Sequence, residues 1–183
     1  MRIMSSYIPS INSKEIASVF SVVALLLTFV AVSGFSSFNS NDEETRAEHF
    51  NLDNGVALDG NDPVAYFTEE AEVEGSSEYS ETYQGVTYYF SSEENLETFR
   101  EDPESFEPKY GGYCAYTMLD GEKQDVNTST FKIIDDELYF FDTMFFGAIN
   151  AKSRWNDMIE ETEGGEAALV EQADAHWQEI IQN

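Results

Sequence analysis

The stretch YSETYQGVTYYF, residues 79–90, decides the fold because it predicts a β-hairpin. Residues 79–83 and 86–90 are two β-prone runs, and Gln84-Gly85 between them supplies the glycine that a two-residue hairpin loop favours. Val86, Tyr88 and Phe90 alternate along the second run, so they share one face of the strand. We expect that face to pack on a hydrophobic core.

Helix signals lie on both sides of the hairpin. Asp62-Pro63 and Asp102-Pro103 each place an N-cap residue before a proline, and they predict short helices at 64–67 and after 103. Ser91 with Glu94 forms a capping-box pattern, which predicts a helix through residue 100. Short helices therefore flank the hairpin.

The carboxyl-terminal part repeats this mixture. Residues 131–134 and 138–141 predict a second hairpin around Asp135-Asp136-Glu137, and helices are expected at 148–159 and 166–181. The second helix carries inward-facing apolar residues at spacings of four, four and three: Leu169, Ala173, Trp177 and Ile180. The expected fold class is α+β: a small module with two β-hairpins and several short helices, followed by carboxyl-terminal helices and preceded by one apolar N-terminal helix.

The amino-terminal segment is apolar over residues 16–32, after Arg2 and Lys14. Residues 1–35 are therefore interpreted as a signal peptide that is cleaved or as a membrane anchor that is retained. Either interpretation predicts an extracytoplasmic location, because the basic residues precede the apolar run. Residues 36–51 are expected to form a flexible acidic tether, and residues 52–183 the folded domain with its helical extension.

The charge of the chain limits its partners. Nine Lys and Arg residues stand against 36 Asp and Glu residues, which gives a net charge of −27. Such a surface repels phosphate groups, so nucleic-acid binding is excluded as a function. It also favours adaptation to a saline setting, where salt screens the repulsion within the chain, and the alternative is that the charge serves ordinary solubility.

Three sequence blocks together resemble the YHS domain family. They are DPVAYF at 62–67, YYFSSEEN at 88–95 and YGGYCAY at 110–116. The module itself resembles the family over residues 57–106, and the later segments resemble an exported subgroup of unknown function. The resemblance implies a small α+β module related to treble-clef metal-binding domains, in which cysteines bind the metal.

This sequence departs from the metal-binding members of that family. Where those members have Phe-Cys-Ser after the hairpin, this chain has Phe90-Ser91-Ser92, and it lacks the Tyr-His-Ser triplet. The metal ligands that the resemblance would supply are absent from the matching positions.

Cys114 is the single cysteine of the chain, so no disulfide forms within it. The residues around it, Tyr110, Gly111, Gly112, Tyr113 and Tyr116, are the candidate ligand-binding residues. Their glycine pair allows a close backbone approach.

Two interpretations of Cys114 stay open: a thiolate that binds a soft metal such as copper(I) or reacts with an oxidant, and a small buried hydrophobe. A copper site would draw on Met118 or Met144. His49 in the tether and His176, expected on the solvent side of the last helix, lie far from Cys114 in sequence. A cysteine–histidine dyad therefore requires the fold to assemble it.

The remaining patterns are short. The acidic clusters at 59–62 and 135–137 lack the spacing of a calcium-binding loop and are typical of turns. Asn127-Thr128-Ser129 matches a glycosylation acceptor.

The sequence favours a non-enzymatic module that binds a small ligand or a metal near Cys114. The alternatives are a structural or protein-interaction module of the cell envelope, with an unknown protein partner, and a thiol-based redox sensor or enzyme that uses Cys114.

Overall fold

In the computed structural model, which describes residues 46–144 and 149–182, the hairpin of the opening stretch is present. Strand β3 (Ser76–Tyr83) pairs antiparallel with β4 (Val86–Phe90), and a bulge interrupts β3 before Ser80. Gln84 and Gly85 have φ values of 47° and 87°, the left-handed pair that a type I′ turn requires. Val86, Tyr88 and Phe90 are fully buried, which confirms the predicted core face.

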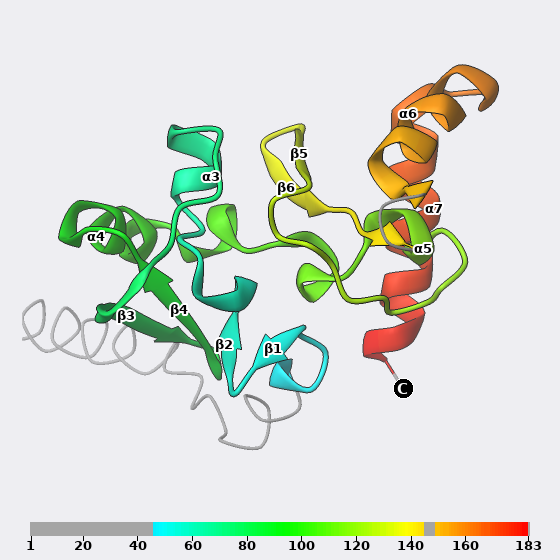
Figure 1. Cartoon of the computed structure of the whole chain (residues 1–183). Helices are drawn as coiled ribbons and strands as arrows, with labels where there is room; N and C mark the ends of the chain where they lie inside the picture. Colours follow the sequence, from blue (N-terminus) through cyan, green and yellow to red (C-terminus); the bar gives the residue numbers. More distant parts are fainter. Residues whose placement is uncertain (1–45, 145–148, 183) are drawn as a thin grey trace, which may run out of the picture. The chain divides into compact units, whose positions relative to one another are not determined.

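Two short strands extend this sheet. Strands β1 (Leu52–Asp53) and β2 (Val56–Ala57) complete the order β1-β2-β4-β3, in which β2 runs parallel to β4 (Figure 1). Neither strand was predicted, because two residues are too few to show an alternating pattern.

Short helices cover the sheet as expected. They are the 3₁₀ turn η1 (Leu58–Gly60), α3 (Ala65–Thr68), α4 (Glu93–Glu101) and the 3₁₀ turn η2 (Pro103–Phe106). Leu96 and Phe99 of α4 are buried against the hairpin. The capping residue of α4 was predicted one position too early: Ser92 caps the helix by accepting a hydrogen bond from the Asn95 N–H at 3.2 Å.

Ser91 does not cap the helix because Asp62 uses its hydroxyl. Asp62 is fully buried, and its Oδ2 accepts hydrogen bonds from the Ser91 N–H at 2.8 Å, the Ser91 hydroxyl at 2.6 Å and the Asn95 amide at 2.7 Å. Its Oδ1 accepts from the Val64 N–H at 2.9 Å and the Ala65 N–H at 3.3 Å. One buried carboxylate thus joins the DPVAYF and SSEEN blocks and fixes the start of α3 against the start of α4.

The carboxyl-terminal part contains, in chain order, η3 (Lys109–Gly112), α5 (Ala115–Met118), β5 (Phe131–Ile134), β6 (Glu137–Phe140), β7 (Thr143–Met144), β8 (Ile149–Asn150), α6 (Ala151–Glu161) and α7 (Gly165–Ile181). The β5–β6 hairpin is present as predicted, but its turn is the two-residue type: Asp135 and Asp136 have φ values of 50° and 63°. Glu137, predicted in the turn, therefore belongs to the strand.

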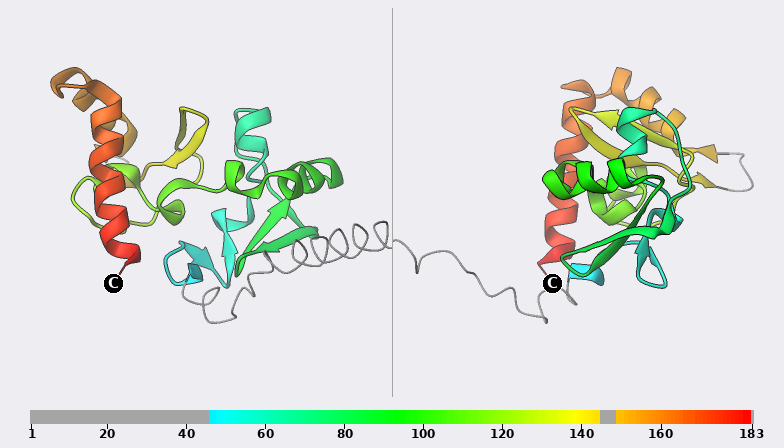
Figure 2. Two further views of the ribbon diagram at one scale, coloured as in Figure 1. Left: turned by 180° about the vertical axis from the view of Figure 1, so that it is seen from behind. Right: turned by 90° about the vertical axis from the view of Figure 1, so that its left-hand side faces the viewer.

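The α6 helix starts later than the sequence suggests. Asn150 caps it by accepting a hydrogen bond from the Ser153 N–H at 3.0 Å, so the helix begins at Ala151 rather than at residue 148, which lies outside the described residues. In α7 the inward positions are as predicted: Leu169 and Ala173 are buried, and Trp177 and Ile180 pack on the core. Helices α6 and α7 pack together and against α5 (Figure 2).

Strand β6 lies between two hydrophobic cores and contributes side chains to both. Leu138 and Phe140 face the first core, which lies under the β1–β4 sheet, whereas Tyr139 faces the second core around Trp155. This division follows from the alternation of side chains along a strand. Figure 1 shows the β5–β6 hairpin between the β1–β4 sheet and the helices α5 to α7. The predicted α+β class is confirmed.

The predictions for residues 1–35 and for most of the tether fall outside the described residues. Within the described ranges, no helix combines the length and the apolarity needed to cross a membrane.

Candidate functional site

The YGGYCAY block turns sharply at its start. Tyr110, Gly111 and Gly112 have φ values of 56°, 60° and 84° in η3. A Cβ added to Gly111 would lie 2.4 Å from the His49 carbonyl oxygen, and the Gly111 carbonyl accepts a hydrogen bond from the Asn51 N–H at 2.8 Å. The close approach that the glycine pair allows is therefore an approach by the chain itself, at residues 49–51.

Residues 46–51 lie against the domain, although the sequence places them in the tether. The Arg46 Nη2 donates to both carboxylate oxygens of Glu107, at 2.6 and 2.5 Å, and the guanidinium lies 4.5 Å from the centre of the Phe50 ring. It also donates to the carbonyls of Tyr83 and Gln84. Arg46 thus holds this segment against the hairpin turn and against Glu107, the residue that follows η2.

Cys114 lies in the second core, where it is fully buried beside Met118 and Trp155. Its Sγ accepts a hydrogen bond from the Asp142 N–H at 3.4 Å, and its own N–H donates to the Gln124 carbonyl at 3.0 Å. This environment is that of a packed small hydrophobe.

The donors near Cys114 do not fit a metal site. Among the described residues, no group of three or more His, Cys, Asp or Glu side chains is placed to hold an ion. Met118 shares the second core with Cys114, while the side chain of Met144 lies outside the description. A hydrophobic core with one thiol and one thioether lacks the ligand set that the family's metal-binding members use.

The other tyrosines of the block point to different places. The Tyr113 hydroxyl donates to the Phe50 carbonyl at 3.4 Å, and Lys123 lies over the Tyr113 ring at 4.9 Å. Tyr116 borders a small hollow of about 340 Å³ next to the acidic side of α6. The six candidate residues therefore do not form one site, and only Tyr110 and Gly111 border the larger cavity described next.

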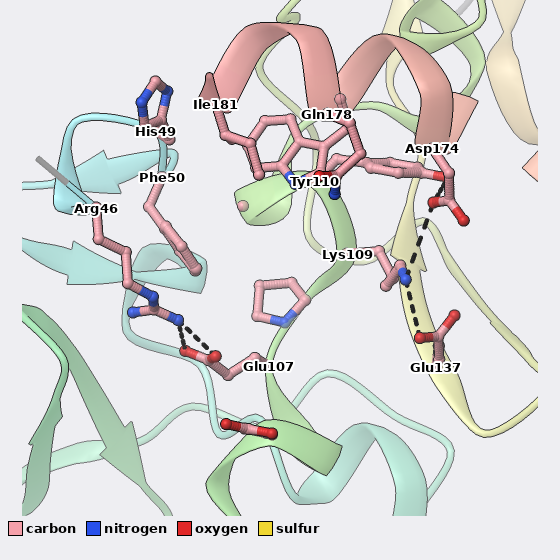
Figure 3. A pocket seen from close by; sticks show the side chains of 14 residues that line it. Arg46, His49, Phe50, Glu107, Lys109, Tyr110, Glu137, Asp174, Gln178 and Ile181 are labelled. Carbon is pink, nitrogen blue, oxygen red and sulfur yellow. Dashed lines mark hydrogen bonds and ion pairs between the residues drawn. The ribbon is translucent and has the colours of Figure 1, made fainter. Parts of the chain in front are cut away.

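That cavity is a cleft of about 800 Å³, which Figure 3 shows from close by. Its walls come from four parts of the chain: residues 46–50, residues 104–111, the start of β6 and the last turns of α7. The lining residues are Arg46, His49, Phe50, Glu104, Glu107, Pro108, Lys109, Tyr110, Gly111, Glu137, Asp174, Trp177, Gln178 and Ile181.

One face of α7 forms a whole wall of the cleft. Asp174, Trp177, Gln178 and Ile181 follow one another at i, i+3, i+4 and i+7, the spacing that puts side chains on the same side of a helix. Trp177 also meets the Tyr110 ring edge-on, with 6.1 Å between centroids. The same helix thus gives the cleft a carboxylate, an aromatic ring and an amide.

Carboxylates outnumber cations in the cleft. Glu104, Glu107, Glu137 and Asp174 stand against Arg46 and Lys109. Lys109 bridges two of these acids, with its Nζ 2.8 Å from Glu137 and 3.9 Å from Asp174 (Figure 3). With Arg46 paired to Glu107, the lining keeps a net charge of −2 when His49 is neutral.

Tyr110 is held in its neutral form. Burial, and then the charge of Asp174, raise the pKa of Tyr110 far above its ordinary value, and its hydroxyl donates to Asp174 Oδ1 at 3.1 Å. Burial opposes ionisation of Glu137, but hydrogen bonds from Lys109 and Tyr139 outweigh it and lower the pKa of Glu137. The cleft therefore presents the ionised Glu137 carboxylate near the neutral Tyr110 phenol at neutral pH.

Sequence reasoning missed most of the cleft. His49, expected in the tether, meets Trp177 edge-on at 6.4 Å, and its Nδ1 is buried with no hydrogen-bond partner. His176, expected on the solvent side, is partly buried, and its Nδ1 lies 3.2 Å from the Met118 carbonyl. An available signal was the pair Arg46 and Phe50, a basic and an aromatic residue in an otherwise acidic, polar stretch.

The described residues form a small α+β domain with a cleft that Tyr110 and α7 border. The family model for the YHS domain matches residues 64–110, from the start of α3 to the Tyr110 wall of the cleft. The chain thus contains a YHS domain, as its sequence blocks indicated. No curated protein and no solved structure matches the chain.

Proposed function

We propose that this chain is a non-enzymatic binding module outside the cytoplasm, and that the cleft beside Tyr110 and Trp177 is its ligand site. The observation that carries the proposal is the cleft itself, because four separate segments converge on one cavity of about 800 Å³. Small-molecule sites in proteins are concave and combine aromatic walls with a few polar groups.

The YHS domain supports a binding role over an enzymatic one. Some members of this family handle metals, but the metal ligands are not retained here, and Cys114 lies in a packed core. Its sulfur contacts a backbone N–H rather than an imidazole base, whereas a thiol nucleophile needs an adjacent base and an accessible position. The thiol-based alternative therefore has less support than the cleft.

An interaction module has less support as well. Protein-binding surfaces usually expose apolar or aromatic side chains in a patch. Among the described residues, Ile181 is the one large hydrophobic residue that is exposed, at 38%, and it lies at the edge of the cleft. The apolar surface that is available thus belongs to the proposed ligand site.

The proposed location depends on residues 1–35, whose apolar run follows two basic residues. Fractionation and mass spectrometry of the natively expressed chain test it. A product that starts near Gly34 or stays in the membrane fraction supports export, whereas a full-length product dissolved in the cell interior contradicts it.

The two tryptophans of the chain provide a test of the site. Trp177 lines the cleft, while Trp155 is fully buried and donates to Glu166 at 2.8 Å. A library of neutral, anionic and cationic small molecules is screened by tryptophan fluorescence against the full-length chain and its Trp177→Phe variant. Hits that change the parent signal and leave the variant silent support the cleft. An absence of hits, or hits that change both proteins equally, contradicts the proposal.

A further inference from the structure

We infer that the ligand of this cleft is an elongated organic cation with two amino groups, a linear diamine or longer polyamine. This inference rests on the proposed function of the cleft and adds the chemistry of its occupant.

The first observation is the combination of Asp174 and Trp177 on one face of α7. They are separated by one helical turn and both line the cleft, so a positive group there meets a carboxylate and an indole ring together. A cation over an aromatic face is attracted by the ring, and indole is the best of the protein rings for this. The side chain of Asp174 is 43% exposed and is therefore within reach of a ligand.

The second observation is that the cleft already holds two cationic groups against its carboxylates, one of them over an aromatic ring. The Arg46 guanidinium lies over the Phe50 ring and pairs with Glu107. The Lys109 ammonium bridges Glu137 and Asp174. These walls place carboxylates beside aromatic rings, and such a setting suits an additional ammonium better than an anion, which would compete with four carboxylates for two cations that are already paired.

The third observation extends the site beyond the cleft. A hollow of about 250 Å³ adjoins it and shares Glu104, Glu107, Lys109 and Glu137 with its lining. The further residues of this hollow are Asp102, Ser105 and Asp136, so its lining has five carboxylates against one lysine. A ligand with one ammonium at Trp177 has a second acidic environment along the same surface. A ligand with one ammonium would occupy the cleft alone, whereas a ligand with two could occupy both the cleft and the hollow.

The net charge of −27 also favours binding of a cationic ligand. A strongly negative surface raises the local concentration of cations and lowers that of anions, and this effect falls as salt screens it. Selectivity then depends on the aromatic wall, because the rest of the acidic surface offers charge alone.

The test uses the full-length chain and a series of α,ω-diamines from diaminopropane to diaminooctane. Pentylamine serves as the singly charged control, pentanediol as the neutral one and glutarate as the anionic one. Binding is measured by calorimetry and by the fluorescence change of Trp177 at one fixed salt concentration. We expect one chain length to bind with 1:1 stoichiometry, and about tenfold more tightly than pentylamine, which corresponds to one moderate charge interaction.

Two variants make the test specific. Asp174→Asn removes the carboxylate beside Trp177 and is expected to weaken the diamine about fivefold, the size of a partly exposed ion pair. Glu171→Gln makes the same charge change at an exposed position of α7 that does not line the cleft, and it is expected to leave the affinity unchanged. Equal effects of the two variants would show that diamines bind the acidic surface as a whole, and the inference would be overturned.

The inference and the proposed function fail in different ways. If glutarate or pentanediol changes the Trp177 signal and no diamine does, the cleft is a ligand site for another class and only the inference is lost. If no compound of the screen or the series acts at Trp177, both are lost.

Discussion

Replacement of Asp62 by asparagine tests the joint that holds the YHS module together. The carboxylate is fully buried and accepts five hydrogen bonds, three of them from the backbone N–H groups of Val64, Ala65 and Ser91. An amide of the same shape has one oxygen. Its amino group must therefore face the Ser91 N–H on one side or the pair of Val64 and Ala65 on the other.

The smaller loss leaves one buried backbone donor without an acceptor, which costs about 1–3 kcal/mol. The Ser91 hydroxyl and the Asn95 amide can reorient, but the remaining bonds lose the carboxylate charge that strengthens them. We expect Asp62→Asn to lower the free energy of unfolding by about 3 kcal/mol, a large share of the 5–15 kcal/mol typical of a domain. The melting temperature should fall by about 10 °C.

Urea unfolding followed by far-ultraviolet circular dichroism measures this change, with salt held constant because of the charge of the chain. Asp53→Asn is the matched control: Asp53 is exposed, so the same substitution there should change stability by less than about 0.5 kcal/mol. If Asp62→Asn unfolds within about 1 kcal/mol of that control, the buried carboxylate does not hold α3 and α4 together and the reasoning is refuted.

Three further predictions concern charge, pH and the thiol. Thermal unfolding at 0.1 M and at molar potassium chloride should give the higher midpoint at molar salt, because screening relieves repulsion among 36 acidic residues; a lower midpoint contradicts the saline interpretation. Burial raises the pKa of Tyr110 and of Tyr139 in the folded state, so the stability they confer is complete below the unfolded-chain pKa of about 10 and is lost as the pH rises from there toward the folded-state pKa. The tyrosinate absorbance that these two buried phenols contribute should accordingly appear together with the loss of circular dichroism. Ionisation of all ten tyrosines in a chain that stays folded would disprove this. The Cys114 thiol should react with an aromatic disulfide no faster than the chain unfolds, and stoichiometric labelling of the native chain within the dead time of mixing would show that its burial is not maintained in solution.

The hairpins could be predicted from the sequence because their signals are local. Gln84-Gly85 and the alternation of Val86, Tyr88 and Phe90 lie within seven residues, and the turn and strands of β5–β6 lie within ten. Ser91 was assigned as the cap one residue too early because its competing partner, Asp62, is distant in the sequence. A capping pattern that considers neighbouring residues alone cannot include a partner 29 residues away.

The cleft could not be predicted for the same reason. It needs Arg46 and Phe50 beside Glu107, and Lys109 beside Asp174, and these pairs lie 57 to 65 residues apart in the sequence. The sequence did direct attention to Tyr110 and Gly111, since consecutive glycines among tyrosines indicate a close approach. The tertiary fold decides which segment makes that approach, and here it is the backbone of residues 49–51.

Cys114 drew attention because it is the single cysteine and has aromatic neighbours in sequence. Its surroundings are decided by distant elements: the backbone at Cys114 pairs with β6 at Phe140, and Trp155 of α6 belongs to the core that buries the thiol. Sequence proximity to tyrosines therefore did not indicate a shared site.

The most direct test of the account is the location of the bound ligand on the chain. Backbone amide resonances of the full-length protein, solubilised in mild detergent, are followed during titration with the tightest diamine of the series. We predict shifts confined to the last two turns of α7, to residues 46–50, to residues 102–111 and to residues 136–137. Shifts spread over the acidic surface, or centred on Cys114 with α7 unchanged, would contradict the claim that the cleft is the binding site.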